Sequence, residues 1–321
     1  MSEKKILLTG VTGFIGQSVW GELISRGVIV SCAVRTRDSV MLVDPAINCL
    51  VLGDFGAQTD WAKALSGVDC IIHCAARSQV SHEPEVVALG IYRAVNVEGT
   101  LRLAEQAAAA GVRRFVFLSS IKVNGENTNG FRRFSSDDVP CPKEPYGVSK
   151  CEAEQGLREI AAKTDLEVVI IRSPLVYGPG VKGNFRSMLD WLNRSIPLPL
   201  ATILNKRSLV GIDNLVDLII ACIDRKAAAN HTFLVSDDED LSTSELLHRM
   251  GVALGKPARL FPVPAFLLQF SARLIGKKYM VERLLGNLQV DIYKTKEVLD
   301  WVPPYTVNEG LRKTAERYLG Q

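Results

Sequence analysis

Three glycines near the start of the chain constrain its fold more than any other feature. Gly10, Gly13 and Gly16 follow an apolar run, Lys5–Thr9, and precede a segment with the apolar spacing of a helix. The missing side chains allow a tight turn, let a phosphate approach the backbone amides and let the helix pack closely against the strand. The N-terminus of that helix then presents the positive end of its dipole to a pyrophosphate. Because strand, turn and helix occur in this order, the segment predicts a dinucleotide-binding site.

Apolar runs typical of strands alternate with helical patterns through the first half of the chain. We expect strands at 5–9, 28–34, 49–52, 70–73, 115–119 and 167–172. One of the intervening helical patterns lies within 100–112, and Gly111 is its expected stop. Alternation of this kind is typical of parallel strands joined by crossover helices. The predicted fold class is therefore α/β, a Rossmann-type doubly wound parallel sheet.

The pattern changes after Gly178, where prolines, short helices and isolated strands replace the regular alternation. We therefore predict a dinucleotide-binding Rossmann domain at 1–178. Residues 179–321 would form a smaller C-terminal α/β portion that mainly binds substrate, with segments that return to the first domain. Since a parallel sheet binds ligands at the carboxyl ends of its strands, we expect the site in the cleft between the two parts.

Composition and charge exclude several classes of function. The formal charge of the 321-residue chain is only +3, which gives no general attraction to nucleic acid or to a membrane surface. Seven cysteines without a regular spacing, and an N-terminus without a signal-peptide pattern, predict a reducing cytoplasm. No apolar run reaches the ~20 residues that a membrane span needs. We predict no nucleic-acid partner, no membrane span and a cytoplasmic location.

The longest apolar candidate, 261–275, is interrupted by Pro262, Pro264, Gln269 and Arg273. We expect an amphipathic helix that packs against the protein or against a second subunit. The alternative is peripheral contact with a membrane surface.

The segment Cys70-Ile-Ile-His73-Cys74 contains residue types that bind zinc. It lies in an apolar strand, where Cys70 and Cys74 share one face and His73 points to the other. Because the three side chains do not converge, we predict no metal site.

The second expected strand ends in arginine where NAD-binding sites usually carry an acidic residue. The segment reads Ser-Cys-Ala-Val-Arg-Thr-Arg-Asp, with Arg35 at or beside that position and Arg37 nearby. A guanidinium group suits a 2′-phosphate and cannot accept the ribose hydrogen bonds that a carboxylate accepts. The predicted cofactor is therefore NADP or NAD, with NADP slightly favoured. In the alternative, Arg35 only stacks over the adenine and Asp38 lies on the surface.

The segment Tyr146-Gly-Val-Ser-Lys150 carries the strongest chemical signal. A tyrosine and a lysine four residues apart lie on the same face of a helix. The pKa of an ordinary tyrosine is about 10, and a nearby ammonium group stabilises the phenolate and lowers that pKa. Upstream, Ser119 and Ser120 end an expected strand and offer hydroxyl groups to a substrate carbonyl or alcohol. Serine, tyrosine and lysine beside a nicotinamide form a hydride-transfer site with a proton relay.

With these motifs in this order, the chain resembles the extended short-chain dehydrogenase/reductase superfamily, in its nucleotide-sugar epimerase/dehydratase branch. The resemblance covers nearly the whole chain. It rests on the segments TGVTGFIG, LGDF, HCAA, NVEGT, YGVSK and RSPLVYGPG, which begin at residues 9, 52, 73, 96, 146 and 172. The stretch 284–311 particularly resembles bacterial enzymes of surface-polysaccharide synthesis that act on UDP-N-acetyl-6-deoxyhexosamines.

The resemblance implies a role for each residue that matches a family motif. Tyr146 would be the acid/base and Lys150 its partner, which would also hold the cofactor. Ser120 would be the catalytic serine, because the family's serine lies four residues before the position of Asn124. The remaining cofactor-binding residues would be Gly10, Thr12, Gly13, Phe14, Ile15, Gly16, Arg35, Asp54, Phe55, Ala75, Ala76, Arg77, Asn96, Pro174 and Val176.

The same resemblance implies substrate contacts. Arg207 precedes an expected strand and would pair with the diphosphate in a bidentate manner. Asn184 would contact the phosphate or the sugar, and Lys122 would reach the sugar. Arg283 would be a second diphosphate clamp or a solvated helix arginine. The family often has tyrosine at the position of Asn124, so that wall of the sugar pocket is expected to differ.

Four functional hypotheses follow. The first is a 4-ketoreductase that acts on a UDP-linked 4-keto-6-deoxy-N-acetylhexosamine with NADPH. The alternative is a UDP-sugar 4-epimerase that acts on UDP-glucose, UDP-galactose or an N-acetyl derivative with tightly bound NAD. A reductase of flavonoid or steroid ketones is disfavoured by Arg207, and a non-catalytic dinucleotide sensor is disfavoured by the tyrosine–lysine pair. Dimers are common in the resembling family, so we expect a homodimer.

Overall fold

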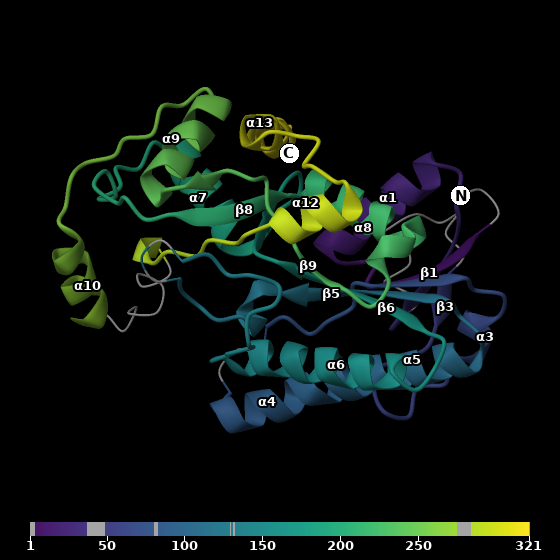
Figure 1. The fold of residues 1–321 in the computed structure, drawn as a ribbon. Coiled ribbons are helices and arrows are strands. Elements are labelled where there is room, and N and C mark those ends of the chain that lie inside the picture. Colours follow the sequence, from purple (N-terminus) through teal and green to yellow (C-terminus); the bar gives the residue numbers. More distant parts are fainter. Residues whose placement is uncertain are drawn as a thin grey trace.

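A parallel sheet runs through the centre of the computed structural model, with the strand order β3-β2-β1-β4-β5-β6-β9 (Figure 1). The structure describes residues 4–36, 49–79, 83–128, 130, 132–274 and 284–320, without the side chains of 271–274. Every neighbouring pair in this sheet is parallel, which confirms the predicted Rossmann-type α/β fold class. The strands are β1 Lys5–Thr9, β2 Ile29–Val34, β3 Cys49–Val51, β4 Cys70–His73, β5 Arg114–Ser120, β6 Glu167–Ser173 and β9 Thr232–Leu234.

The six strands expected from the sequence are all present, and their ends differ from the prediction by at most one residue. Helix α5, Thr100–Ala109, forms as expected and is followed by Gly111, whose φ of +76° is a conformation that glycine adopts easily. Strand β9 comes from the second half of the chain and pairs with β6 through Thr232 and Ile170. The sequence predicts that segments of the second half return to the first part, but it does not identify β9 as the strand that pairs with β6.

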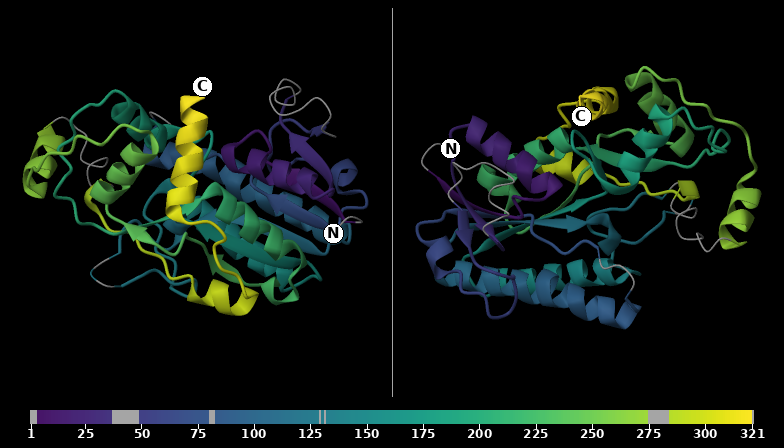
Figure 2. Two further views of the ribbon diagram at one scale, coloured as in Figure 1. Left: turned by 90° about the horizontal axis from the view of Figure 1, so that it is seen from above. Right: turned by 180° about the vertical axis from the view of Figure 1, so that it is seen from behind.

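Helices cover both faces of the sheet (Figures 1 and 2). Alternate side chains of β1 explain the two layers, because Ile6 and Leu8 belong to one buried apolar cluster and Leu7 to another. One layer contains α1 Phe14–Ser25, α8 Ile212–Asp224 and α12 Tyr293–Leu299. The other contains α3 Ala62–Leu65, α4 Glu85–Arg93, the π-helical turn η1 Ala94–Gly99, α5 and α6 Pro145–Ala161.

A smaller part of the molecule is built on a second sheet, ordered β10-β8-β7. It has its own hydrophobic core, to which Phe185, Leu247 and Leu311 contribute. Its elements are β7 Leu175–Tyr177, α7 Gly183–Asn193, β8 Arg207–Gly211, β10 Asp240–Leu241, α9 Thr243–Ala253 and α13 Val307–Leu319. Two short 3₁₀ helices, η2 Ile121–Val123 and η3 Lys226–Ala228, complete the described elements other than α10. The domain boundary after residue 178 stays a prediction, since α8 and β9 return to the larger part.

The apolar stretch 261–275 contains helix α10, Ala265–Leu274, which lies at the edge of the molecule (Figure 1). Leu268 packs against the core of the smaller part, while Phe266 and Phe270 are 67% and 62% exposed. The expected packing against the protein is therefore partial. Within the described ranges, no helix has the length and apolar character needed to cross a bilayer.

Candidate active site

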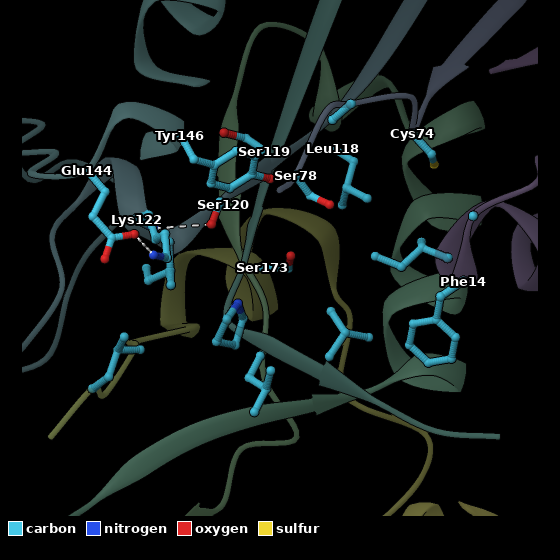
Figure 3. Close-up of a pocket in the computed structure, with 18 of the residues that line it drawn as sticks. Phe14, Cys74, Ser78, Leu118, Ser119, Ser120, Lys122, Glu144, Tyr146 and Ser173 are labelled. Carbon is cyan, nitrogen blue, oxygen red and sulfur yellow. Dashed lines mark hydrogen bonds and ion pairs between the residues drawn. The ribbon is translucent and has the colours of Figure 1, made fainter. Parts of the chain in front are cut away.

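A cavity of about 730 Å³ opens at the carboxyl ends of the central strands (Figure 3). This is the place where parallel sheets bind ligands, and it joins the glycine turn to the tyrosine of α6. The predicted residues that line it are Gly10, Gly13, Phe14, Ile15, Gly16, Ala76, Ser120, Lys122, Tyr146, Pro174, Val176 and Arg207.

A second cavity of about 820 Å³ adjoins the first and shares Gly10, Gly13 and Ala76 with it. The predicted residues that it adds are Thr12, Arg35, Asp54, Phe55, Ala75 and Arg77. The glycine turn therefore lies between a cavity lined by Arg35 and a cavity lined by Tyr146. This order fits a dinucleotide whose pyrophosphate lies on the turn, with the adenosine toward Arg35 and the nicotinamide toward Tyr146.

Two positions of the turn admit only glycine. Gly10 has a φ of +77°, and a Cβ atom there would lie 2.6 Å from the backbone nitrogen of Ala75. A Cβ atom on Gly16 would lie 2.1 Å from the carbonyl oxygen of Gly10. Gly13, which precedes α1, provides no side-chain cap for the first amides of the helix. These amides are the groups that a pyrophosphate accepts hydrogen bonds from.

Asn96 contacts the wall of the second cavity through Arg77 and is not itself among the lining residues. Its side-chain nitrogen donates to the carbonyl oxygen of Arg77 and to Oγ of Ser149, each at 3.0 Å. Its Oδ1 accepts a hydrogen bond from the backbone N–H of Arg77 at 2.8 Å. Asn96 lies in the π-helical turn η1, a distortion that is frequent at functional sites. The side chain thus ties the cavity wall at Arg77 to α6, the helix that carries Tyr146.

The two serines at the end of β5 differ in their surroundings. Ser119 is buried, and its hydroxyl donates to Oε1 of Glu154 at 2.6 Å. Ser120 lies beside Tyr146 in the cavity, and its Oγ accepts a hydrogen bond from the backbone N–H of Lys122 at 3.3 Å (Figure 3). The Ser120 hydroxyl can therefore donate to a ligand, which favours Ser120 as the candidate catalytic serine.

Tyr146 and Lys150 lie one helical turn apart on α6. Lys150 is 1% exposed, and its ammonium group lies 3.9 Å from the centre of the Phe117 ring. Burial raises the pKa of Tyr146 to about 12 and lowers the pKa of Lys150 to about 7. In this structure desolvation is the larger effect on the tyrosine pKa, because burial disfavours both charged forms, and the effect of Lys150 on the phenolate stays a prediction. A positively charged nicotinamide in the cavity would favour the phenolate.

Charged side chains line the cavity on the other side of Tyr146 from Phe14 (Figure 3). Lys122 forms ion pairs with Glu144 and, at 3.5 Å, with Glu126. Such a lining suits a ligand with many hydroxyl groups, because an apolar ligand would desolvate these charges without replacing their hydrogen bonds. Lys122 thus offers charge and hydrogen-bonding capacity to a polar ligand on this side of Tyr146.

The other predicted substrate residues are only partly brought together. Arg207, the first residue of β8, lines the cavity, and its Nη1 donates to the carbonyl oxygen of Gly286 at 3.0 Å. Asn184 is exposed in the first turn of α7 and is not among the lining residues. Arg283 and Arg37 lie outside the described residues.

Asn124 occupies the position where the resembling family often has tyrosine, and it is not among the lining residues either. It is buried, with Oδ1 accepting from Nη1 of Arg172 at 2.9 Å and Nδ2 donating to the carbonyl oxygen of Ser135 at 2.7 Å. Asn124 therefore belongs to a polar network beneath the cavity.

His73, the residue that suggested a zinc site, is held inside the sheet. Its two ring nitrogens form hydrogen bonds with Oγ1 of Thr9 at 2.7 Å and Oγ1 of Thr100 at 3.0 Å. Burial lowers the pKa of the imidazole to about 3. Across the described ranges, no three His, Cys, Asp or Glu side chains come together as metal ligands would.

Several lining residues were missed from the sequence, among them Ser78, Glu126, Asn127, Lys143, Glu144 and Leu288. Glu144 carried a usable signal, since a carboxylate two residues before Tyr146 must lie near the start of the same helix. Leu288 carried none. It reaches the cavity because it pairs with Arg207 in a β-bridge between segments that are distant in sequence.

A Rossmann sheet with a glycine turn, and with serine, tyrosine and lysine gathered at its strand ends, defines a dinucleotide-dependent enzyme of the short-chain dehydrogenase/reductase type. Comparison with protein families narrows this class. Residues 6–236 match the model of the NAD dependent epimerase/dehydratase family, and the chain belongs to that family.

Known proteins resemble the chain over nearly its full length. A Vibrio cholerae protein named UDP-glucose 4-epimerase is 46% identical over 98% of this chain and 96% of its own. An Escherichia coli O157:H7 protein named N-acetyl-alpha-D-glucosaminyl-diphospho-ditrans,octacis-undecaprenol 4-epimerase is 27% identical over 97% and 94%. The crystal structure of a Bacillus cereus UDP-glucuronic acid 4-epimerase in complex with NAD superposes with a TM-score of 0.78 at 20% identity, covering 98% and 99%. That structural likeness supports the fold.

Proposed function

We propose that the chain is a UDP-hexose 4-epimerase with a retained dinucleotide, acting on UDP-glucose and UDP-galactose or on their N-acetyl derivatives. The observation that carries the proposal is the 46% identity to the Vibrio cholerae protein named UDP-glucose 4-epimerase. The Escherichia coli relative, also named as a 4-epimerase of a diphospho-linked sugar, supports the same position of reaction. The charged cavity lining and Arg207 favour such a ligand over a steroid or flavonoid ketone.

The residues of the cavity suit the proton transfers of such a reaction. The glycine turn and the residues of the two cavities would hold the oxidised dinucleotide, which when bound supplies a reversible hydride acceptor for C4. Tyr146 would take the proton of the C4 hydroxyl as the carbonyl forms and give it back when the carbonyl is reduced. Ser120 would donate a hydrogen bond to the C4 oxygen, and the ammonium group of Lys150 would stabilise the phenolate. Arg207 would hold the diphosphate while the sugar turns to present its other face.

Two expectations exist for the identity of the retained nucleotide, NAD and NADP. The family is described as NAD-dependent, and the Bacillus cereus neighbour was solved with NAD. Arg35 lines the adenosine cavity with Asp54 nearby, and its guanidinium group favours the 2′-phosphate of NADP. Extraction of the nucleotide from purified protein, followed by separation of NAD(H) from NADP(H), decides between them. Finding NADP would support the role of Arg35 at the 2′-phosphate.

The competing function is reduction of a UDP-4-keto-6-deoxy-N-acetylhexosamine, for which Arg35 and the C-terminal resemblance are the supporting features. A reductase consumes NADPH in each turnover, whereas an epimerase consumes no added cofactor. We would therefore incubate the protein with UDP-galactose, UDP-N-acetylgalactosamine or the 4-keto sugar, with and without NADPH. Interconversion of a UDP-hexose without added nucleotide supports the proposal. If the protein instead oxidises NADPH stoichiometrically with the 4-keto sugar and does not interconvert the UDP-hexoses, the reductase replaces the epimerase as the proposed function.

The homodimer expected from the sequence stays a prediction.

A further inference from the structure

A buried polar network connects the elements that carry the three candidate catalytic residues. Its centre is Glu154, which is fully buried on α6, one turn beyond Lys150 and two turns beyond Tyr146. These three residues are spaced at four-residue intervals, so they lie along one face of the helix. The proposed mechanism uses Tyr146 and Lys150 but assigns no role to Glu154.

The carboxylate of Glu154 reaches two strands of the sheet. Its Oε1 accepts the hydroxyl of Ser119 at 2.6 Å and Nε of Arg172 at 2.9 Å. Its Oε2 accepts Nη2 of Arg172 at 2.6 Å and Nη2 of Arg158 at 3.0 Å. Ser119 directly precedes Ser120 on β5, and Arg172 lies on β6 just before the Ser173 and Pro174 wall of the cavity. Glu154 therefore fixes α6 against the ends of both strands.

Arg172 extends the network to the far side of Ser120. Its Nη1 donates to Oδ1 of Asn124, which lies directly after the 3₁₀ turn that follows Ser120. The backbone that presents the Ser120 hydroxyl is thus held at residue 119 and at residue 124 by one carboxylate–guanidinium pair. Arg172 is 1% exposed, and buried charges of this kind are stable only when paired.

Glu154 also places a negative charge near the Lys150 ammonium group. From β4 the neutral imidazole of His73 faces this lysine, as does the thiol of Cys74, which directly follows the strand. From β5 the Phe117 ring covers it. From α6 itself, Tyr146 and Glu154 lie one turn to either side. Burial lowers the lysine pKa, and the charge of Glu154 opposes that shift. The thiol of Cys74 has a pKa raised to about 12 by burial, so it is neutral at physiological pH.

We propose that Glu154 is a positioning residue for Ser120, Tyr146 and Lys150. Through Ser119 and Arg172 it holds the Ser120 backbone, and through its negative charge it keeps Lys150 charged. This inference rests on the proposed function for its kinetic consequence. Its structural consequence, the charge state of Lys150, can be measured without any substrate.

The decisive variant is Glu154→Gln, which keeps the shape of the side chain and removes its charge. We would titrate Lys150 by NMR in protein labelled with ¹³C at lysine Cε, assigning its signal with Lys150→Arg. The midpoint of the lysine is expected to fall by about one pH unit. Because one unit changes the charged fraction about tenfold above the midpoint, kcat at alkaline pH should fall about tenfold, with KM less affected.

The matched control is Glu159→Gln, which removes a carboxylate from the exposed side of the same helix. It should leave the midpoint and kcat unchanged. Glu154→Asp keeps the charge and should retain the wild-type midpoint. An unchanged Lys150 midpoint in folded Glu154→Gln would overturn the charge role, whatever the activity of the wild type.

If Glu154→Gln does not fold, Ser119→Ala tests the inference, because it removes only the hydrogen bond to Glu154 and keeps every charge. We expect a fall in kcat of about fivefold or more, the equivalent of about 1 kcal/mol for one hydrogen bond, with an unshifted pH profile. Full kcat in Ser119→Ala would contradict the positioning of Ser120. Absence of any wild-type activity would count against the proposed function, while the NMR midpoint would still test Glu154.

Discussion

Tyr146 is the residue on which the proposed chemistry depends most directly. The Tyr146→Phe variant keeps the ring, which contacts Tyr92 edge-on at 5.8 Å between ring centres, and removes the hydroxyl. Since positioned general acid–base groups typically contribute ~10²- to 10⁴-fold, we expect kcat for epimerisation to fall within this range. The measurement is the rate of UDP-hexose interconversion, with thermal unfolding as a check of the fold.

Tyr293→Phe is the matched control, because Tyr293 is an exposed tyrosine of α12 whose hydroxyl donates to Oε1 of Glu297 at 2.7 Å on the outer surface of the protein. It should keep the wild-type rate. A Tyr146→Phe variant with wild-type kcat would remove Tyr146 from the mechanism.

The shifted pKa of buried His73 leads to a prediction of how the free energy of unfolding depends on pH. Folding lowers the pKa of this buried imidazole from 6.5 to about 3, so below pH 6.5 the unfolded chain binds more protons than the folded chain. The free energy of unfolding therefore decreases as the pH falls, and this group contributes a loss of about 2 kcal/mol at pH 5. Denaturant unfolding of wild type and His73→Asn at pH 7 and pH 5 measures it. An equal pH dependence in both proteins would refute this assignment.

At the scale of the element, the β1–turn–α1 unit makes a sharp prediction. In Gly16→Ala the new Cβ atom would lie 2.1 Å from the carbonyl oxygen of Gly10, so the turn must shift. We expect a loss of about 1–3 kcal/mol in unfolding free energy, as for other overpacked sites, and loss of the nucleotide that copurifies with the protein. Chemical denaturation and nucleotide extraction provide the two readouts.

The same helix offers a control at Gly21, where a Cβ atom would have no neighbour within 4 Å among the described parts of the chain. Gly21→Ala should stabilise α1 by about 0.5–1 kcal/mol, because alanine loses less backbone freedom than glycine in a helix. Nucleotide retention should be unchanged. If both variants bind nucleotide equally well, the close packing at Gly16 has no role in the site.

The elements of the first sheet were predictable because their signals are local. The apolar runs are short and separated by turn or polar residues, and the helical spacing between runs indicates parallel strands joined by crossover helices. The placement of Tyr146 and Lys150 on one helix was predictable for the same reason, since their spacing is local. The pKa of Tyr146 was not, because it depends on how deeply α6 is buried.

At the scale of the whole molecule, Arg207 brings a charged residue of the smaller part to the cavity at the strand ends of the larger sheet. Arg207→Gln removes the charge expected to pair with the diphosphate, so KM for the UDP-sugar should rise about tenfold or more while kcat changes little. Steady-state kinetics separates the two constants. Arg194→Gln, at an exposed position after α7, should leave both unchanged. A fall in kcat alone would place Arg207 outside diphosphate binding.

Long-range pairings set the limit of prediction from sequence. Strand β9 joins β6 although α7, β8 and α8 lie between them in the chain, and Leu288 reaches the cavity through its bridge to Arg207. Neither contact has a local pattern, because each depends on where α8 and the smaller sheet pack. The burial of Asn124 in the Glu154–Arg172 network is of the same kind.

The most direct test of the central claim is the fate of hydrogen at C4. We would supply UDP-glucose deuterated at C4 in ordinary water without added nucleotide and examine the UDP-galactose formed by NMR and mass spectrometry. Transfer of hydride within the site through a retained dinucleotide predicts that deuterium stays at C4 of the product. Loss of the deuterium to solvent, or no product without added nucleotide, would contradict the account.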